Sequence, residues 1–300
     1  MQYNGALILD KPQDFTSFDV CAVLRRLCGE RRIGHTGTLD PMATGVLMIL
    51  IGRATRAASF LEDTDKVYRA EFRFGTETDT QDSTGNVLRT DETAVSRAAL
   101  LAMLPQFRGE IEQVPPMYSA VSVNGQRLYD LARRGETVER KARRIRIDRL
   151  ELEAYDETAR TGTLLVSCSK GTYIRTLCAD LAQALGTCGV MTALRRVQAC
   201  GFTLKDALTL DEVRALAAEG TLGTRVLPVE SLFASDRAVS VSAAQAVRFT
   251  NGGALDLQRI PSLRQAAQQE RVRVYAPDRA FLGLGEVSPE TGALRILKLF

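Results

Sequence analysis

The alternation of hydrophobic and polar positions predicts short strands and helices from the start of the chain. Ala6 to Leu9 is an apolar run typical of a strand. A helix that Thr16 or Ser17 can cap follows, because apolar residues then recur at helical spacing. These residues are Phe18, Cys21, Leu24 and Cys28. The continuous apolar run from Val46 to Ile51 predicts a buried strand that follows a long glycine-rich loop.

The middle of the chain continues this mixture of elements. We expect a helix from about Ala54 to Glu62, then a half-buried strand over residues 67–74, where apolar and polar side chains alternate. Ser96 can cap a helix that runs to about Phe107. Residues 145–154 and 163–169 predict paired strands.

The third part of the chain leads to a separate small module. A loop over residues 169–173 turns into a helix, a strand follows, and Thr209 with Glu212 forms a capping box for another helix. A boundary is expected near residues 233–237. Beyond it one short helix and three short strand-like segments predict a β-rich module. We therefore expect one domain over residues 1–236 and a second over residues 237–300.

The order of the elements favours an α+β fold. Strands and helices are mixed without the regular spacing of a parallel doubly wound sheet, so a mixed, mainly antiparallel sheet flanked by helices and loops is expected. The composition, with 45% hydrophobic and 25% charged residues, is that of an ordinary folded protein rather than a disordered or collagenous one. No run approaches the roughly 20 apolar residues of a membrane span, and we expect a cytoplasmic protein.

Cysteine and histidine usage argues against a metal site. The six cysteines never form C-x-x-C pairs, and the sole histidine, His35, has no cysteine near it in sequence. Scattered cysteines of this kind usually behave as small buried hydrophobes. The acidic segment over residues 79–85 lacks the length and the terminal Glu of a calcium loop, and we interpret it as a turn.

Charge is concentrated in one segment rather than spread over the chain. The formal net charge is only +3, but Arg127 to Arg149 holds nine Lys/Arg against four Asp/Glu, a local +5 that leaves about −2 for the other 277 residues. This segment belongs to an insertion, about 115–149, that reaches outward from the predicted sheet. Contact with a phosphate backbone and a solvated charged face are both compatible with it.

A glycine-rich loop carries the strongest candidate for chemistry. The loop from Gly34 to Pro41, GHTGTLDP, places His35 and Asp40 just before a buried strand, where a rigid scaffold can hold a carboxylate at the surface of a cleft. A phosphate-binding Walker A loop is excluded because no G-K-[S/T] follows the second glycine. From residue chemistry alone, a turn or a helix cap is the favoured interpretation of Asp40.

The same string resembles the aspartate motif of the TruB family of pseudouridine synthases. Further motifs occur in the order and approximate spacing of that family: Asp10-Lys11-Pro12, Tyr68, Gly171-Thr172-Tyr173-Ile174-Arg175 and Leu194-Arg195-Arg196. The resemblance covers residues 5 to about 235, and the tail resembles the family's PUA-like module more weakly. A generic β-barrel appendage fits the tail almost as well.

The resemblance implies a role for each residue of these motifs. Asp40 is the catalytic carboxylate, which attacks either C6 of uracil or C1′ of the ribose, and Arg175 keeps it charged. Tyr68 stacks on the target base and Leu194 packs on its other side. His35 contacts displaced nucleotides, Tyr173 lines the substrate site, and Lys11 belongs to a motif that supports the active-site floor. In the family the basic insertion closes over RNA, and its candidate contacts here are Arg133, Arg134, Arg143 and Arg144.

The activity implied by the resemblance is the isomerisation of a tRNA T-loop uridine, position 55, to pseudouridine. It needs a flipped-out base but neither metal nor organic cofactor, and we expect a monomer without an obligate protein partner. Three alternatives stay open: a synthase that acts on ribosomal RNA with a guide RNA, an inactive RNA-binding or tRNA-folding protein, and a glycosidase-like enzyme. The last is disfavoured because no second acid near Asp40 in sequence suggests an acid/base partner.

Overall fold

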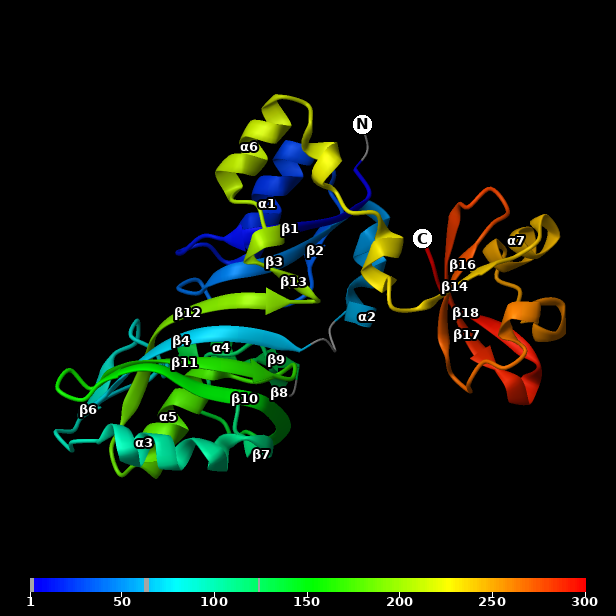
Figure 1. Ribbon diagram of the computed structural model, residues 1–300. Helices are drawn as coiled ribbons and strands as arrows, with labels where there is room; N and C mark the ends of the chain where they lie inside the picture. The colour runs from blue at the N-terminus through cyan, green and yellow to red at the C-terminus, as the bar shows by residue number, and fades with distance from the viewer. Residues whose placement is uncertain (1–2, 62–64, 124) are drawn as a thin grey trace.

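A long mixed sheet forms the larger part of the molecule. The computed structural model describes residues 3–61, 65–123 and 125–300. Nine strands of the described chain form this sheet, whose main path runs β1-β3-β12-β4-β11-β10-β7, with β2 paired to β3 and β13 paired to β12. A second sheet, of five strands, lies to one side (Figure 1). The expected α+β architecture is confirmed.

The first third of the long sheet is buried on both faces. β1 (Gly5–Lys11) pairs antiparallel with β3 (Thr44–Ile51), which also pairs with β2 (Ile33–His35). Alternate residues of β1 and β3 belong to two different apolar clusters, one on each face. A strand covered on both sides needs apolar residues at every position, which explains the unbroken run in β3.

The rest of the sheet is antiparallel and covered on one side. Its strands are β4 (Lys66–Phe74), β7 (Gly109–Gln113), β10 (Arg143–Asp156), β11 (Thr161–Cys168), β12 (Gly189–Ala199) and β13 (Phe202–Thr203). In β4 the even-numbered residues are buried, whereas Arg69, Glu71 and Arg73 are exposed. This alternation is the expected signature of a strand with one solvated face.

A narrow parallel seam joins the two parts of the sheet. β3 and β12 share only two residue pairs, Arg195 with Thr44 and Arg196 with Gly45. Gly45 has a φ of 108°, and a Cβ built there would lie 2.2 Å from the carbonyl oxygen of Arg196. Only glycine permits so close an approach of the two backbones.

Helices cover the sheet and connect its strands. They are α1 (Ser17–Cys28), α2 (Ala58–Leu61), α3 (Arg97–Met103), α5 (Ile174–Ala184) and α6 (Leu210–Ala218), with 3₁₀ turns at Gly52–Ala57, Leu104–Phe107, Leu204–Asp206, Leu222–Arg225 and Val229–Phe233. Thr16, Ser96 and Thr209 accept N-cap hydrogen bonds as predicted. The predicted helix from Ala54 is a 3₁₀ turn followed by α2, and its expected end at Glu62 lies outside the described residues.

Two excursions leave the long sheet. The first is a hairpin of β5 (Thr76–Thr78) and β6 (Val87–Thr90), whose connection contains the turn expected over residues 79–85. The second holds β8 (Ser122–Val123), β9 (Gln126–Arg127) and α4 (Leu128–Arg133). The insertion, expected over about 115–149, is shorter than predicted. Residues 143–149 lie in β10, which pairs with β7 and β11.

The C-terminal sheet is built from the last 64 residues. Its strands are β14 (Arg237–Ser240), β15 (Leu255–Asp256), β16 (Arg271–Tyr275), β17 (Phe281–Ser288) and β18 (Ala293–Leu299), with α7 (Ala243–Thr250) and 3₁₀ turns at Leu257–Arg259, Pro261–Leu263 and Pro289–Thr291. Its curled sheet has the form expected of a PUA-like module. Phe281, Leu284 and Phe300 pack into the same apolar cluster as Phe233 and the outer face of β1.

The fold gives the burial of the cysteines and of the predicted apolar face of α1. The six cysteines, all within the described ranges, form no disulfide; five are buried and Cys200 is partly buried. Phe18 was expected on the apolar face of α1 but is 65% exposed, because Val20 takes the core position in that turn. No helix of the described residues is both long and apolar enough to cross a membrane.

Candidate active site

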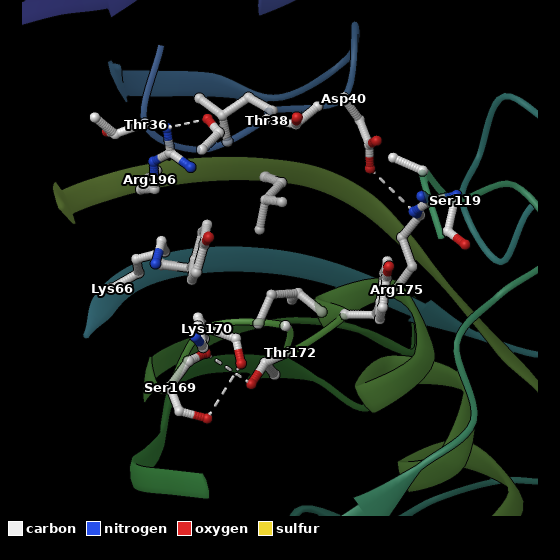
Figure 2. Close-up of a pocket in the computed structure, with 18 of the residues that line it drawn as sticks. Thr36, Thr38, Asp40, Lys66, Ser119, Ser169, Lys170, Thr172, Arg175 and Arg196 are labelled. Carbon is white, nitrogen blue, oxygen red and sulfur yellow. Dashed lines mark hydrogen bonds and ion pairs between the residues drawn. The ribbon is translucent and has the colours of Figure 1, made fainter. Parts of the chain in front are cut away.

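A cavity of about 430 Å³ opens where the two parts of the long sheet meet. Its walls come from the loop after β2, the adjoining faces of β4 and β12, the loop before α5 and the start of the insertion (Figure 2). Six of the residues predicted from the sequence line it: His35, Asp40, Tyr68, Tyr173, Arg175 and Leu194. Segments far apart in the chain therefore converge on one site of ordinary ligand-pocket size.

Hydrogen bonds of Ser17 and Lys11 hold the loop that carries Asp40. Ser17, at the start of α1, accepts a hydrogen bond from the Leu39 N–H at 2.9 Å. Lys11 is fully buried, and its ammonium donates to the carbonyl oxygens of Pro12 (2.8 Å), Phe15 and Pro41 (3.2 Å). The resemblance assigns Lys11 to the support of the active-site floor, and its side chain does not line the cavity. It holds the loop rather than a ligand.

Asp40 and Arg175 form the ion pair on which the sequence-based mechanism depends. Arg175 Nε lies 3.0 Å from Asp40 Oδ2. The guanidinium is itself fixed, because it donates to the carbonyl oxygens of Thr80 at 3.0 Å and Tyr118 at 2.8 Å. The side chain of Asp40 is 36% exposed and that of Arg175 only 6%. Arg175 thus presents a rigid cation to a carboxylate that remains accessible from the cavity.

A third charged group completes this end of the cavity. Asp82 is buried in the turn between β5 and β6, and its carboxylate lies 3.6 Å from Arg175 Nη1. The hydroxyls of Thr80 and Thr84 donate to Asp82 at 2.8 and 2.6 Å. Sequence reasoning missed Asp82, because a polar turn sequence does not reveal that one of its carboxylates is buried against a distant arginine.

The protonation of Asp40 is set by opposing effects. Burial raises the pKa of Asp40 above its usual range, the charge of Arg175 lowers it, and the negative charge of Asp82 raises it again. The balance leaves the pKa of Asp40 raised. The Asp40 carboxylate is therefore more basic than an ordinary aspartate, and it depends on the charge of Arg175 to remain ionised.

An aromatic and an aliphatic side chain form the apolar walls. Tyr68 on β4 and Leu194 on β12 are each 8% exposed and line the cavity on neighbouring strands. Burial raises the pKa of the Tyr68 phenol, an effect opposed by the charge of Arg196 and by a hydrogen bond from it. The phenol is therefore a neutral proton donor or acceptor at ordinary pH.

His35 lies at the rim of the cavity. Its ring meets the exposed ring of Phe18 edge-on, with centroids 5.5 Å apart. Burial, aided by Arg196, lowers the pKa of His35, which favours the neutral imidazole. Its Nδ1 is buried without a hydrogen-bond partner among the described residues, so the proton is best placed on Nε2.

The arginines predicted to contact RNA lie outside the cavity. Arg133 and Arg134 are at the end of α4, and Arg143 and Arg144 begin β10; all four are exposed. Arg134 pairs with Glu136 at 2.7 Å, and Arg133 packs over the Tyr129 ring. Half-exposed pairs of this kind contribute little stability, so these side chains are available to a partner at small cost.

Replacing these four arginines together by glutamine is expected to weaken tRNA binding and to flatten its salt dependence. Each lost phosphate contact removes roughly 0.7 to 0.9 from the slope of log K against log salt concentration, so the magnitude of the slope should fall by up to about 3.6 if all four arginines contact phosphates. Filter binding at several salt concentrations measures it. Replacing Arg89, Arg97, Arg214 and Arg225, exposed residues outside both the insertion and the C-terminal module, is a charge-matched control. An unchanged slope in the quadruple variant of the insertion would show that the insertion is only a solvated face.

Two further cations line the cavity. Lys66 and Arg196 are 9% and 2% exposed and lie across the cavity from Asp40 and Arg175 (Figure 2). Arg196 belongs to the Leu194-Arg195-Arg196 motif but was assigned no role from the sequence. Lys66 was missed because a lysine at a strand start is usually solvated. No group of three or more His, Cys, Asp and Glu within the described ranges is placed to hold a metal ion.

Comparison with solved structures identifies the fold class. The fold matches the structure titled "Crystal Structure of a Cbf5-Nop10-Gar1 Complex" with a TM-score of 0.75 and 22% identity, covering 99% of this chain and 85% of that one. It also matches "Structure of H/ACA RNP bound to a substrate RNA containing 2'-deoxyuridine" with a TM-score of 0.73 and 20% identity, over 99% and 84% of the two chains. The chain therefore shares the fold of the proteins in these two structures.

Comparison with protein families and curated relatives gives the family. Residues 25–174 match the N-terminal domain model of TruB family pseudouridylate synthases, and residues 175–234 and 238–294 match two TruB C-terminal models. The chain is 43% identical to a tRNA pseudouridine synthase B of Pseudomonas putida, over 96% of this chain and 92% of that protein. A Burkholderia mallei enzyme of the same name is 42% identical, over 95% and 93%. The chain belongs to the TruB family of pseudouridylate synthases.

Proposed function

We propose that this enzyme converts the T-loop uridine of tRNA, position 55, to pseudouridine, with Asp40 as the nucleophile. The observation that carries the proposal is the 3.0 Å pair of Asp40 and Arg175 at one end of a cavity walled by Tyr68 and Leu194. The relatives that are 42–43% identical are named for tRNA. The tRNA substrate is taken from these relatives.

The target base must leave its stack before it can enter the cavity. Extrusion costs a few kcal/mol, and stacking on an aromatic ring returns about 1–3 kcal/mol. Tyr68 supplies such a ring, and Leu194 closes on the opposite side of the base. His35, at the rim with a neutral imidazole, is placed to donate from Nε2 to a neighbouring nucleotide. Tyr173 borders the same entrance.

Asp40 then acts on the uridine as an ionised carboxylate. In one route its oxygen adds to C6 of uracil, and the C1′–N1 bond of the adduct then breaks. In the other it attacks C1′ and displaces uracil as the C1′–N1 bond breaks. The base turns, C5 bonds to C1′, the carboxylate is released, and the C5 proton moves to a base while N1 gains a proton. Arg175 keeps Asp40 charged before attack and receives it again at the end. Tyr68 is the candidate for handling the C5 proton.

The test is incubation of the purified protein with an unmodified tRNA transcript, followed by mapping of pseudouridine. We expect product at the T-loop uridine, and conversion should continue with excess EDTA, because every step above uses the nucleotide and protein side chains. Product only in ribosomal RNA with a guide RNA, or binding without product, would replace the proposal with one of the alternatives. A rate that falls with EDTA would refute the cofactor-free mechanism.

The PUA-like sheet is proposed to hold a second part of the same RNA. It packs against the outer face of β1 through Phe281, Leu284 and Phe300, so it is anchored beside the catalytic sheet. An RNA that reaches from the cavity to this sheet can contact both. The described chain contains both parts of the proposed binding surface, consistent with action as a monomer.

A further inference from the structure

The end of the cavity away from Asp40 carries two buried cations that the mechanism above does not use. Lys66 begins β4, two residues before Tyr68 and on the same face of the strand. Arg196 comes from β12, two residues after Leu194. Figure 2 shows both side chains on the opposite side of the cavity from Asp40 and Arg175. The cavity therefore has a carboxylate at one end and positive charge at the other.

The backbone at Gly37 shows how closely the two cations approach. A Cβ built on Gly37 would lie 3.6 Å from Lys66 Cε and 3.6 Å from Arg196 Nη1. Arg196 is fixed there, because its Nε donates to the Val46 carbonyl at 2.7 Å and its Nη2 to the Gly37 carbonyl at 3.2 Å. Burial lowers the pKa of Lys66, and the charge of Arg196 lowers it further. Like charges held together cost free energy, and an anion formed beside them would recover it.

Both routes open to Asp40 create negative charge on the same atom of uracil. Addition to C6 moves the C5–C6 electron pair into the C4 carbonyl, which becomes an enolate with its charge on O4. Attack at C1′ breaks the C1′–N1 bond, and the electron pair leaves with uracil as an anion whose charge is shared by N1, O2 and O4. Charge at O4 rises in either case, so a donor to O4 assists whichever route the enzyme takes.

The shape of the ring directs O4 toward the two cations. C4 lies across the six-membered ring from N1, so a uridine with its glycosidic bond at Asp40 projects O4 toward the far end of the cavity. Tyr68 and Leu194, on the walls between the two ends, leave the ring edges exposed to both. The far end is where Lys66 and Arg196 lie (Figure 2).

We infer that Lys66 is a further catalytic residue, whose ammonium donates a hydrogen bond to uracil O4 and stabilises the charge that develops there. Arg196 is the fixed cation beside it, with donors already committed to two backbone carbonyls. An ammonium has three donors on a flexible stem and can follow the base as it turns. The interaction strengthens as O4 gains charge, so it lowers the barrier more than it tightens binding. This inference rests on the proposed function.

The test replaces Lys66 by methionine and compares two tRNA substrates, one with uridine and one with 4-thiouridine at the target position. Conversion is followed in single-turnover reactions by nucleoside analysis. With uridine, Lys66→Met should lower the rate by about 10²- to 10³-fold, the usual effect of losing a donor to a developing oxyanion. With 4-thiouridine the loss should be about tenfold smaller, since sulfur accepts a weaker hydrogen bond. The tRNA affinity should change by less than about threefold.

Matched variants separate this role from structure and from RNA binding. Lys66→Arg keeps the charge and should recover part of the rate, and Lys66→Gln supplies a polar replacement if methionine impairs folding, as judged by thermal unfolding. Lys170, an exposed residue of the same cavity, gives a control: Lys170→Met should have equal effects on both substrates. Equal losses on both substrates for the Lys66 variants, or no loss, would overturn the inference. Failure of the wild-type enzyme to convert uridine would instead refute the proposed function.

Discussion

Asp40→Asn is expected to lower the rate of pseudouridine formation by about 10⁴-fold or more while tRNA binding is retained. An amide has nearly the shape of the carboxylate, and its oxygen can still accept from Arg175, so the cavity should keep its form. It lacks the negative charge that either attack route requires. Single-turnover conversion of a tRNA transcript, together with filter binding of the same transcript, measures both quantities.

A matched substitution shows that the loss belongs to Asp40. Asp211, 90% exposed on α6, pairs only with Arg214 of the same helix among the described residues. Asp211→Asn makes the same chemical change far from the cavity and should leave the rate unaltered. If Asp40→Asn formed pseudouridine within about tenfold of the wild-type rate, another group would have to be the nucleophile.

Replacing Arg175 by methionine is expected to reduce the rate at neutral pH by about 10²-fold or more and to shift its dependence on pH. The active form of Asp40 is ionised, so the rate falls as pH decreases through its pKa. Burial and the negative charge of Asp82 both raise that pKa, and the positive charge of Arg175 is the strongest effect that lowers it. Without Arg175 the acid limb should move to higher pH, and part of the lost rate should return as pH is raised.

The form of the pH profile distinguishes this electrostatic role from simple misfolding. Arg175 also donates to the carbonyls of Thr80 and Tyr118, so its loss can loosen the hairpin and the insertion. A loosened structure would lower the rate at all pH values alike. Arg175→Lys restores the charge without the fork of donors and should move the acid limb back toward its original position. An unshifted limb in Arg175→Met would show that Arg175 does not set the ionisation of Asp40.

Sequence patterns predicted most of the elements because burial imposes a period on each strand and helix. The alternation in β4 and the unbroken run in β3 follow from one covered face and two covered faces, respectively. The exposure of Phe18 was not predictable from helical spacing. Val20, two residues later in the same helix, is also apolar, and it is Val20 that is buried. The extent of the insertion was also misjudged, because residues 143–149 belong to β10, and the basic side chains among them are exposed there.

The candidate site was predicted in part by its resemblance to a known family rather than by composition. Asp40 and Arg175 are 135 positions apart in sequence, and nothing in the periodicity links them; the structure places them 3.0 Å apart. Asp82 and Lys66 were not predicted, because a polar turn accounts for the first and a solvated strand start for the second. Their burial beside charges from other segments is visible only in three dimensions.

The catalytic residues come from both sides of the narrow contact between β3 and β12. The loop with Asp40 precedes β3, whereas Tyr68, Arg175 and Leu194 all stand on the other side of that contact. Gly45 at the contact has no room for a methyl group. A side chain at position 45 would therefore push β3 and β12 apart. This would move Asp40 away from the base that it must attack, without changing the contacts within either part of the sheet.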